Sequence, residues 1–170
     1  PTFFNRDGLL RGLKRSCHEG GIRIPFIARW PGHVEAGKVN DHMLAFYDIL
    51  PTFMDLGGMG AQFPEGIQHD ENDCFDGISF APTLLGLAGQ ACHDHLYWEF
   101  HETQQVGVRR GDWKLVMKDQ QYFLYNLATD IHEDQDVKEE FPDVLAELKA
   151  IIRKEHVQPE VSFFDFPIHD

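Results

Sequence analysis

Four short runs rich in aromatic and β-branched residues follow one another in the second half of the chain. These runs are Leu96–Phe100, Val106–Arg110, Trp113–Met117 and Tyr122–Leu127. Runs of this length and composition are typical of β-strands. The pairs Gly111-Asp112 and Asp119-Gln120 separate the later runs at hairpin distances. The pattern therefore predicts a small antiparallel sheet of up to four strands.

An amphipathic helix is predicted after the last of these runs, between Phe141 and His156. Its apolar residues recur at helical spacing, and they are Val144, Leu145, Leu148, Ile151 and Ile152. Pro142 lies near the first helical position, where its missing N–H is not needed. A helix with one apolar face must bury that face against another element. We therefore expect this helix to cover the sheet.

The first part of the chain has a different pattern. Residues 1–21 show neither a strand period nor a helix period, and we expect mostly loop. Ile22–Trp30 is apolar at nearly every position, which is typical of a strand that is buried on both faces of a parallel sheet. Pro25 cannot donate to a strand ladder, so the predicted strand begins near that residue.

Two helices are expected after this strand. Residues 43–56 carry a helical pattern with Asp48 as a candidate N-cap, and a shorter helix is predicted for residues 81–87. The expected fold class is therefore α+β. It joins the end of an α/β domain, residues 1–90, to an antiparallel sheet with a covering helix, residues 91–170.

The composition excludes some classes of partner. The chain has 170 residues, of which 28 are acidic and 15 are basic, and its formal charge is −13. A general affinity for nucleic acid or for an anionic membrane is therefore not expected, although a local group of cations can still bind a small anion. The cysteines Cys17, Cys74 and Cys92 lack the close spacing of a zinc or redox site, and we expect free thiols or at most one disulfide.

The most distinctive motif is the stretch Lys14–Gly32, KRSCHEGGIRIPFIARWPG, which places a lysine in a loop before a Gly-Gly turn. The stretch resembles the lysine segment of the type I sulfatases, which belong to the alkaline phosphatase superfamily. The matching residues are Leu10, Arg11, Gly12, Lys14, Glu19, Gly20, Gly21, Ile22, Arg23, Pro25, Arg29, Trp30, Pro31 and Gly32. The resemblance implies an alkaline-phosphatase-like fold for the α/β part.

Later blocks of the chain resemble the same family in the same order. They are Asp76–Leu85, Leu96–Glu102, Val108–Leu115 and Leu124–Val137. The resemblance thus extends over residues 3–156. It implies roughly the C-terminal third of a sulfatase, an enzyme that hydrolyses sulfate esters, with a sulfated carbohydrate as the expected substrate.

The resemblance also implies roles for particular residues. Lys14 is expected to be the catalytic and substrate-binding residue, because its ammonium would hold sulfate oxygens and stabilise charge on the departing ester oxygen. His101 is expected to contact the sugar. Considered alone, Lys14 is better explained as a solvated surface lysine, and the functional interpretation depends on the motif around it. Glu19, Arg23 and Arg29 are expected to form ion pairs that fix the loop carrying Lys14.

Two other groups of residues have weaker functional interpretations. Cys17 and His18 combine a nucleophile with a base, but adjacent side chains seldom point in the same direction. The histidines His93, His95 and His101 lie among acidic residues and permit a metal site, but a solvated acidic strand edge explains them better. No metal ligand is assigned to this chain.

Two parts of a sulfatase site are not found in the sequence. The nucleophile of the family is a formylglycine made from Cys or Ser that is followed two positions on by Pro or Ala and four on by Arg. No Cys or Ser here has that pattern, and no Asp-Asn calcium pair precedes Lys14. We therefore expect the chain to be inactive by itself, with no cofactor of its own and with calcium in the full-length parent. The start at Pro1, without Met or an apolar leader, predicts a piece cut from a longer chain. The resemblance implies that the parent protein is periplasmic or secreted.

Other interpretations stay open at this point. A non-catalytic module could hold a sugar or a protein through Tyr97, Trp98 and Trp113, and a related phosphoester hydrolase is a third possibility. The expected partner is a sulfated small molecule or glycan, without nucleic acid or membrane. A truncated chain would expose apolar surface near residues 22–28 and Phe53, which predicts dimerisation or low solubility.

Overall fold

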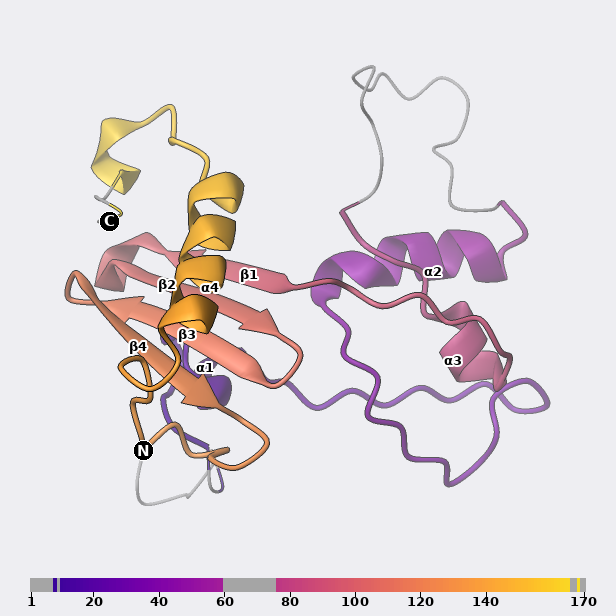
Figure 1. Cartoon of the computed structure of the whole chain (residues 1–170). Coiled ribbons are helices and arrows are strands. Elements are labelled where there is room, and N and C mark those ends of the chain that lie inside the picture. The colour runs from indigo at the N-terminus through magenta and orange to yellow at the C-terminus, as the bar shows by residue number, and fades with distance from the viewer. Residues whose placement is uncertain (1–7, 9, 60–75, 166–167, 169–170) are drawn as a thin grey trace. The chain divides into compact units, whose positions relative to one another are not determined.

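Figure 1 shows the computed structural model, which describes residues 8, 10–59, 76–165 and 168. The chain forms two compact units. One consists of Pro1–Ile24 and Asp94–Asp170, and the other consists of Pro25–His93. Within the described residues, no helix has the length and apolar character that are needed to cross a membrane.

The first unit is built around a four-stranded antiparallel sheet. Its strands are β1 (Leu96–Phe100), β2 (Gln105–Arg110), β3 (Trp113–Lys118) and β4 (Gln121–Asn126). Their spatial order is the order of the sequence, β1-β2-β3-β4, with antiparallel pairing throughout. The predicted sheet is confirmed.

The turn between β3 and β4 shows why local sequence was informative here. Lys118 pairs with Gln121, so the connection has only two residues, Asp119 and Gln120. Both have positive φ angles, 51° and 62°. Two-residue hairpin turns of this kind match the twist of the flanking strands. The turn therefore sets the register of the two strands.

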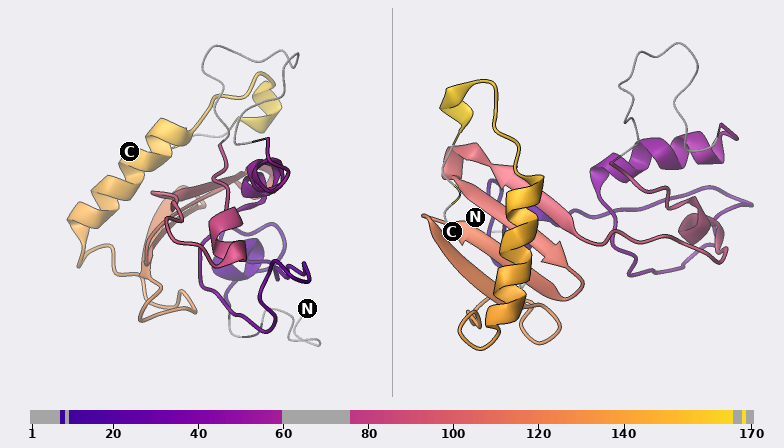
Figure 2. Two further views of the ribbon diagram at one scale, coloured as in Figure 1. Left: turned by 90° about the vertical axis from the view of Figure 1, so that its right-hand side faces the viewer. Right: turned by 45° about the horizontal axis from the view of Figure 1, so that its top comes forward.

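Helix α4 (Pro142–Glu155) covers one face of this sheet, as predicted (Figures 1 and 2). Its residues Leu148 and Ile152 are fully buried. They pack into an apolar core with Val106, Val108, Leu115, Met117 and Leu124. Burying two such side chains stabilises the fold by roughly 2 kcal/mol each before entropy is counted.

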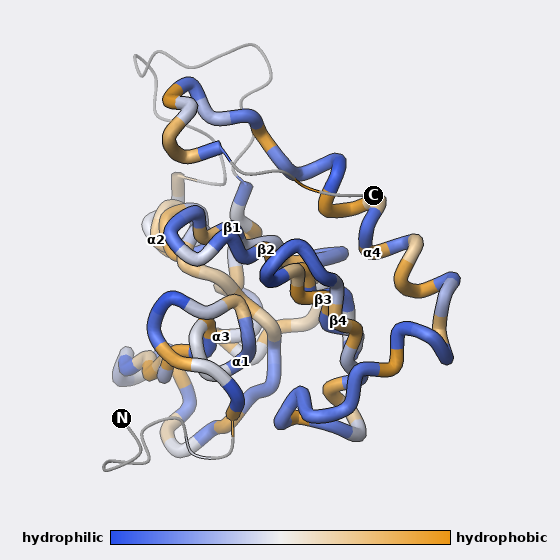
Figure 3. The backbone as a smooth tube through the Cα atoms, turned by 90° about the vertical axis from the view of Figure 1, so that its left-hand side faces the viewer, coloured by the Kyte–Doolittle hydropathy of each residue, from blue (hydrophilic) through white to orange (hydrophobic). Residues whose placement is uncertain are grey.

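The segment Arg11–Ile22 covers the opposite face of the sheet and ends in helix α1 (Glu19–Ile22). Figure 3 shows α1 and α4 on opposite sides of the strands. Buried Cys17 packs here against Val116 and Tyr125. A Cβ atom on Gly107 would lie 3.0 Å from the Cys17 Cβ atom, so a glycine in β2 allows this close approach.

The second unit contains η1 (Phe46–Asp48), α2 (Ile49–Leu56) and α3 (Ala81–Leu85). Asp48 precedes α2, as predicted, but its carboxylate does not cap that helix. It accepts hydrogen bonds from the backbone N–H groups of Ala45 and Ile78, and it lies 2.8 Å from His93 Nε2. Buried Asp48 thus joins three separate segments of this unit.

The predicted strand at Ile22–Trp30 is wrong. Ile22 ends helix α1, and the residues that follow are extended but are not part of a strand. Ile27 is 91% exposed, and Phe26 and Trp30 are also exposed. A strand requires a neighbour to pair its backbone groups, and no such neighbour is present among the described residues. An apolar run shows that burial is favourable, but not which element provides it.

The two units do not follow the predicted division of the chain at residue 90. Residues up to Ile24 belong to the unit that contains the sheet, and the other unit ends at His93. The reason is a set of long-range hydrogen bonds, such as that from the Cys17 N–H group to Gln105 Oε1 at 3.1 Å. Contacts of this kind join residues far apart in the sequence, and periodicity does not reveal them.

The C-terminal tail returns to the same unit as the sheet. Its short helix η3 (Ser162–Phe164) brings the Phe163 and Phe164 rings against His101, with centroid distances of 6.2 and 4.6 Å. The three phenylalanines of the tail, Phe163, Phe164 and Phe166, suggest from sequence that it folds back onto the body, and of these Phe166 lies outside the described residues.

Replacing Gly21 by Ala tests the packing of α1. A Cβ atom at this position would overlap the Ser16 carbonyl oxygen and lie 2.7 Å from the Leu13 carbonyl oxygen, and backbone atoms cannot move aside cheaply. We expect Gly21→Ala to lower the free energy of unfolding by about 2 to 4 kcal/mol in urea titrations. Gly57→Ala is the control, because the φ angle of Gly57, −80°, is one that alanine adopts readily, and a Cβ atom there would come no closer than 3.2 Å to a neighbouring carbonyl oxygen. Equal midpoints for the two variants would contradict this packing.

Candidate functional site

Lys14 lies in a closed loop. The loop is joined at its base by the Gly20 N–H group, which donates to the Arg11 carbonyl oxygen at 2.7 Å, and it contains a turn in which the Ser16 N–H group donates to Leu13 at 3.0 Å. A Cβ atom on Gly20 would lie 2.7 Å from the Arg11 oxygen, so glycine is needed for this closure. The closed backbone holds the loop in one shape.

An open hollow of about 420 Å³ separates this loop from strand β1. It is lined by Lys14, Arg15, Ser16, Cys17, Gly21, Ile22, Trp98, Glu99, Phe100 and Glu102. The Arg15 guanidinium lies 3.1 Å from the Glu102 carboxylate, and Thr103 donates a hydrogen bond to the Arg15 carbonyl oxygen at 3.2 Å. The loop is therefore tied to the segment that follows β1.

The Lys14 side chain is exposed. Within the described part of the chain its ammonium has no acidic partner, whereas neighbouring Arg15 is paired with Glu102. An unpaired ammonium with three donors, placed at the edge of a hollow, can bind an anionic oxygen. The predicted catalytic role of Lys14 stays a prediction.

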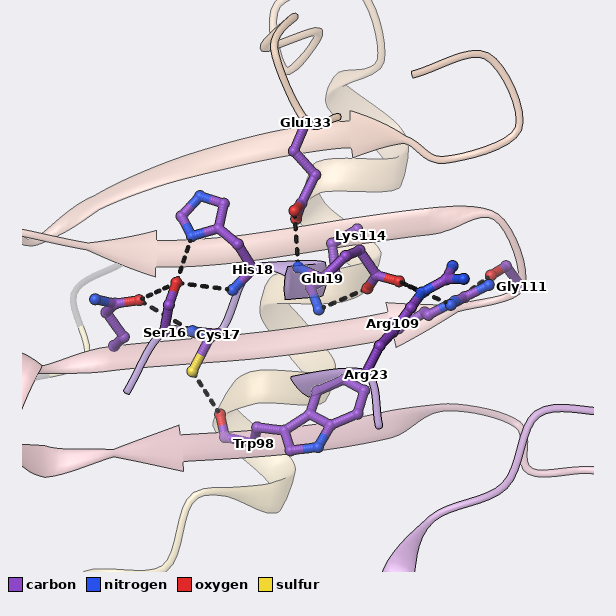
Figure 4. Close-up of polar contacts among 11 residues, drawn as sticks. Ser16, Cys17, His18, Glu19, Arg23, Trp98, Arg109, Gly111, Lys114 and Glu133 are labelled. Atoms are coloured by element: carbon purple, nitrogen blue, oxygen red, sulfur yellow. Dashed lines mark hydrogen bonds and ion pairs between the residues drawn. The ribbon is translucent and has the colours of Figure 1, made fainter. Parts of the chain in front are cut away.

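Beneath the loop, Glu19 is the centre of a buried ion cluster (Figure 4). Its Oε1 atom lies 3.1 Å from Lys114 Nζ, and its Oε2 atom lies 2.6 Å from Arg23 Nε and 3.1 Å from Arg109. Glu19 and Lys114 are both 0% exposed. Burial acts to raise the pKa of Glu19, but the three cations outweigh it, and the pKa is lowered. The carboxylate is therefore ionised. The predicted pair of Glu19 and Arg23 is confirmed.

A second buried carboxylate, Glu133, holds the backbone at the same place. Its Oε2 atom accepts the Glu19 N–H group at 2.8 Å, and the Arg11 guanidinium donates to its carbonyl oxygen. Its Oε1 atom has no partner among the described residues. Burial raises the pKa of Glu133 to about 7, although Lys114 acts in the opposite direction.

Cys17 and His18 do not form a nucleophile and base. Burial raises the pKa of the Cys17 thiol to about 11, so the thiol is protonated near neutral pH. Burial, with help from Arg11, lowers the pKa of His18 to about 4. His18 Nδ1 lies 3.0 Å from the Ser16 hydroxyl. Both residues are parts of the packed loop.

His101 lies beside the hollow, but its ring packs against the tail. Phe100 and Glu102, on either side of it, line the hollow, whereas the His101 ring meets the Phe164 ring edge-on at 4.6 Å. The predicted sugar contact of His101 therefore stays a prediction.

The other histidines considered for a metal site have separate partners. His93 binds Asp48, and His95 lies 3.2 Å from Asp94 and 3.4 Å from Glu155. In the described ranges, no group of three or more His, Cys, Asp or Glu residues is arranged to hold a metal ion. The residues that the structure describes thus do not fit the calcium ion that the family resemblance implies, and no step is assigned to it.

The aromatic residues proposed for a binding module do not share one surface. Trp98 lines the hollow, whereas Tyr97 and Trp113 pack on the opposite face of the sheet, against the core beneath α4. Successive strand residues point to opposite faces, so Tyr97 and Trp98 cannot contact one ligand together.

Sequence reasoning missed the residues that support the loop from below. Lys114, Glu133 and Gln105 are all buried and all bond to the segment Cys17–Glu19. One signal was visible, because Lys114 is a charged residue near the start of a strand whose following residues, Leu115–Met117, are all apolar. A buried lysine in such a position requires a partner, but the sequence does not say which acid that is.

Known sulfatases resemble this chain in sequence. Arylsulfatase A from Bos taurus is 36% identical over 111 residues, which cover 64% of this chain and 20% of that protein. An N-acetylgalactosamine-6-O-sulfatase from Bacteroides thetaiotaomicron is 27% identical over 166 residues, which cover 85% of this chain and 29% of that protein.

Solved structures show the same likeness. A sulfatase structure reported with the metabolism of multiple glycosaminoglycans by Bacteroides thetaiotaomicron has a TM-score of 0.68 at 26% identity, and the match covers 86% of this chain and 32% of that chain. Ps i-CgsB in complex with k-i-k-neocarrahexaose has a TM-score of 0.63 at 27% identity, and the match covers 82% of this chain and 30% of that chain.

These likenesses define the class of the protein as a part of a sulfatase. The model of the family described as N-sulphoglucosamine sulphohydrolase, C-terminal, matches residues 12–158, and the chain belongs to that family. The chain spans only 20% of arylsulfatase A and 32% of the Bacteroides thetaiotaomicron structure. The predicted resemblance to sulfatases is confirmed.

His18 and Glu133 give the unfolding free energy two opposite pH dependences. His18 has a pKa of about 4 when folded and 6.5 as a free side chain, so the unfolded chain binds more protons between these values and stability rises with pH. Glu133 has a pKa of about 7 against 4.5, so the folded chain binds more protons between these values and stability falls with pH. The two pH dependences of the unfolding free energy oppose each other in the pH range where both groups titrate.

We expect Glu133→Gln to remove the falling slope. Gln keeps an oxygen for the Glu19 N–H group but does not titrate, so the unfolding free energy of the variant should rise from pH 4.5 to 6.5. Between pH 4.5 and pH 8 the wild type should lose roughly 2 to 3 kcal/mol of stability through Glu133, and the variant should not show this loss. Urea unfolding at several pH values measures this. Glu139→Gln at an exposed position is the control, and a pH profile of Glu133→Gln identical to that of the wild type would contradict the assignment.

Proposed function

We propose that this chain is the C-terminal portion of a sulfatase that hydrolyses sulfate esters of a sulfated carbohydrate. The observation that carries the proposal is Lys14. It is exposed, it has no acidic partner among the described residues, and it stands at the edge of a hollow in a closed loop. The relatives support the substrate class, because one is an N-acetylgalactosamine-6-O-sulfatase and Ps i-CgsB was solved with an oligosaccharide.

In this proposal the Lys14 ammonium holds the sulfate. It donates hydrogen bonds to sulfate oxygens and stabilises the negative charge that develops on the departing ester oxygen. Trp98 and Phe100 offer apolar ring surface in the same hollow, which suits the apolar face of a sugar. His101 is proposed as a further sugar contact, reached by movement of its ring away from Phe164.

The nucleophile and the metal ion of the enzyme are proposed to come from other parts of the parent protein. The formylglycine nucleophile and the calcium ion are placed in a portion of the parent enzyme outside these residues, and the parent is placed in the periplasm or outside the cell. No Cys or Ser in the sequence has the formylglycine pattern. The chain by itself is therefore proposed to bind but not to hydrolyse a sulfate ester.

Replacing Lys14 by Ala tests the role of this residue. The substitution is made in a polypeptide that joins the chain to a formylglycine-bearing sulfatase portion, and turnover of a sulfated sugar is measured. We expect kcat/KM to fall about 100-fold or more, because a charge aimed at the transition state is lost. Lys154→Ala is the control, since that lysine is 76% exposed on α4. Unchanged turnover in Lys14→Ala would refute the proposal.

We further propose that the chain in isolation self-associates through exposed apolar side chains. Ile27 is 91% exposed and Phe53 is 68% exposed. Exposed apolar surface of this kind favours association. We expect light scattering to show dimers or larger species for the chain and less association for Ile27→Asp than for the control Gln158→Asp, which adds the same charge at an exposed polar position. A monodisperse monomer of the unaltered chain would contradict this expectation.

A further inference from the structure

The hollow beside Lys14 has two walls, and buried Lys114 contacts a residue in each of the two elements that form them. One wall is the segment that ends in α1, with Gly21 and Ile22, and the other is β1, with Trp98. Lys114 lies beneath them in strand β3. Its Nζ atom is 3.1 Å from Glu19 Oε1 in the first wall and 4.6 Å from the centroid of the Trp98 ring in the second.

Stability alone gives a weak reason for this arrangement. Glu19 and Lys114 are 0% exposed, and removing two charges from water costs free energy that their attraction only partly returns. Apolar residues of similar volume often serve at least as well in a core. Unlike an apolar contact, a buried ion pair is favourable only when its two charged groups hold a particular relative position, so it fixes that position. Glu19 keeps that geometry with the help of Arg23 and Arg109.

The position of Glu19 is transmitted to the loop through the backbone. The Glu19 N–H group is bound by Glu133, and the next N–H group, that of Gly20, closes the loop by donating to Arg11. Gly20 and Gly21 have no room for a side chain, because the backbone carbonyl groups of the loop lie against them. A displacement of Glu19 therefore displaces the base of the loop that carries Lys14.

We propose that Lys114 is a positioning residue for Lys14. Through Glu19 it holds the loop that carries Lys14, and through the Trp98 ring it holds strand β1 on the other side of the hollow. One buried cation therefore sets the distance between the Lys14 loop and β1. The inference rests on the function proposed above, because it assigns Lys114 a part in the reaction of Lys14.

A double-mutant cycle tests whether Lys114 acts through Lys14. In the sulfatase proposed above, we expect Lys114→Met to lower kcat on the order of 10- to 100-fold when Lys14 is present. In the Lys14→Ala background the same change should have almost no further effect, because the group that it positions is absent. The control Lys118→Met removes an exposed lysine from the same strand and should leave kcat unchanged. Equal losses in both backgrounds would overturn the inference.

A second variant separates positioning from loss of the fold. Glu19→Gln with Lys114→Met removes the charges of both members of the pair, and the Gln oxygen can still accept hydrogen bonds from Arg23 and Arg109. We expect its unfolding free energy to exceed that of Lys114→Met alone, while kcat stays low. Recovery of kcat together with stability would show a structural role only and would overturn the inference. Failure of the proposed function has a different result, which is that Lys14→Ala itself leaves turnover unchanged.

Discussion

The ion pair between Glu19 and Lys114 is the interaction on which the first unit depends. Both groups are fully buried and lie 3.1 Å apart, and Glu19 is also held by Arg23 and Arg109. The pair ties the N-terminal segment to the middle of the sheet across 95 positions of sequence. If either charge were removed alone, the remaining one would be buried without its main partner, which is among the costliest defects that a core can contain.

The two faces of the sheet use different physical means to hold their covers. Helix α4 is held by apolar burial, with Leu148 and Ile152 seated on a continuous core. The opposite face carries Gln105 and Lys114, and it holds its cover through polar groups that require exact partners. Apolar packing tolerates small displacements, whereas hydrogen bonds and ion pairs are directional. The directional face is the one that carries Lys14, and this is consistent with a loop whose position matters.

Sequence reasoning was accurate where neighbours in the chain decide the structure. The strands, their short turns and α4 follow from local composition and period, because each is stabilised by residues that lie close in sequence. It was wrong at Ile22–Trp30, where apolar content predicted a buried strand and the structure has no strand and several exposed apolar residues. Strand pairing is a property of two segments, and one segment cannot reveal its partner.

The sequence by itself determined that Lys14 lies in a loop within a motif that resembles the sulfatases, although the Gly-Gly pair after the loop lies in helix α1 and not in the predicted turn. Only the tertiary structure decided what supports that loop. Lys114 and Glu133 could be read in the sequence as an unusual strand lysine and an ordinary glutamate. Their roles arise from burial and from partners more than 90 positions away. The physical reason is that the free energy of a charge depends on its surroundings, and folding creates those surroundings.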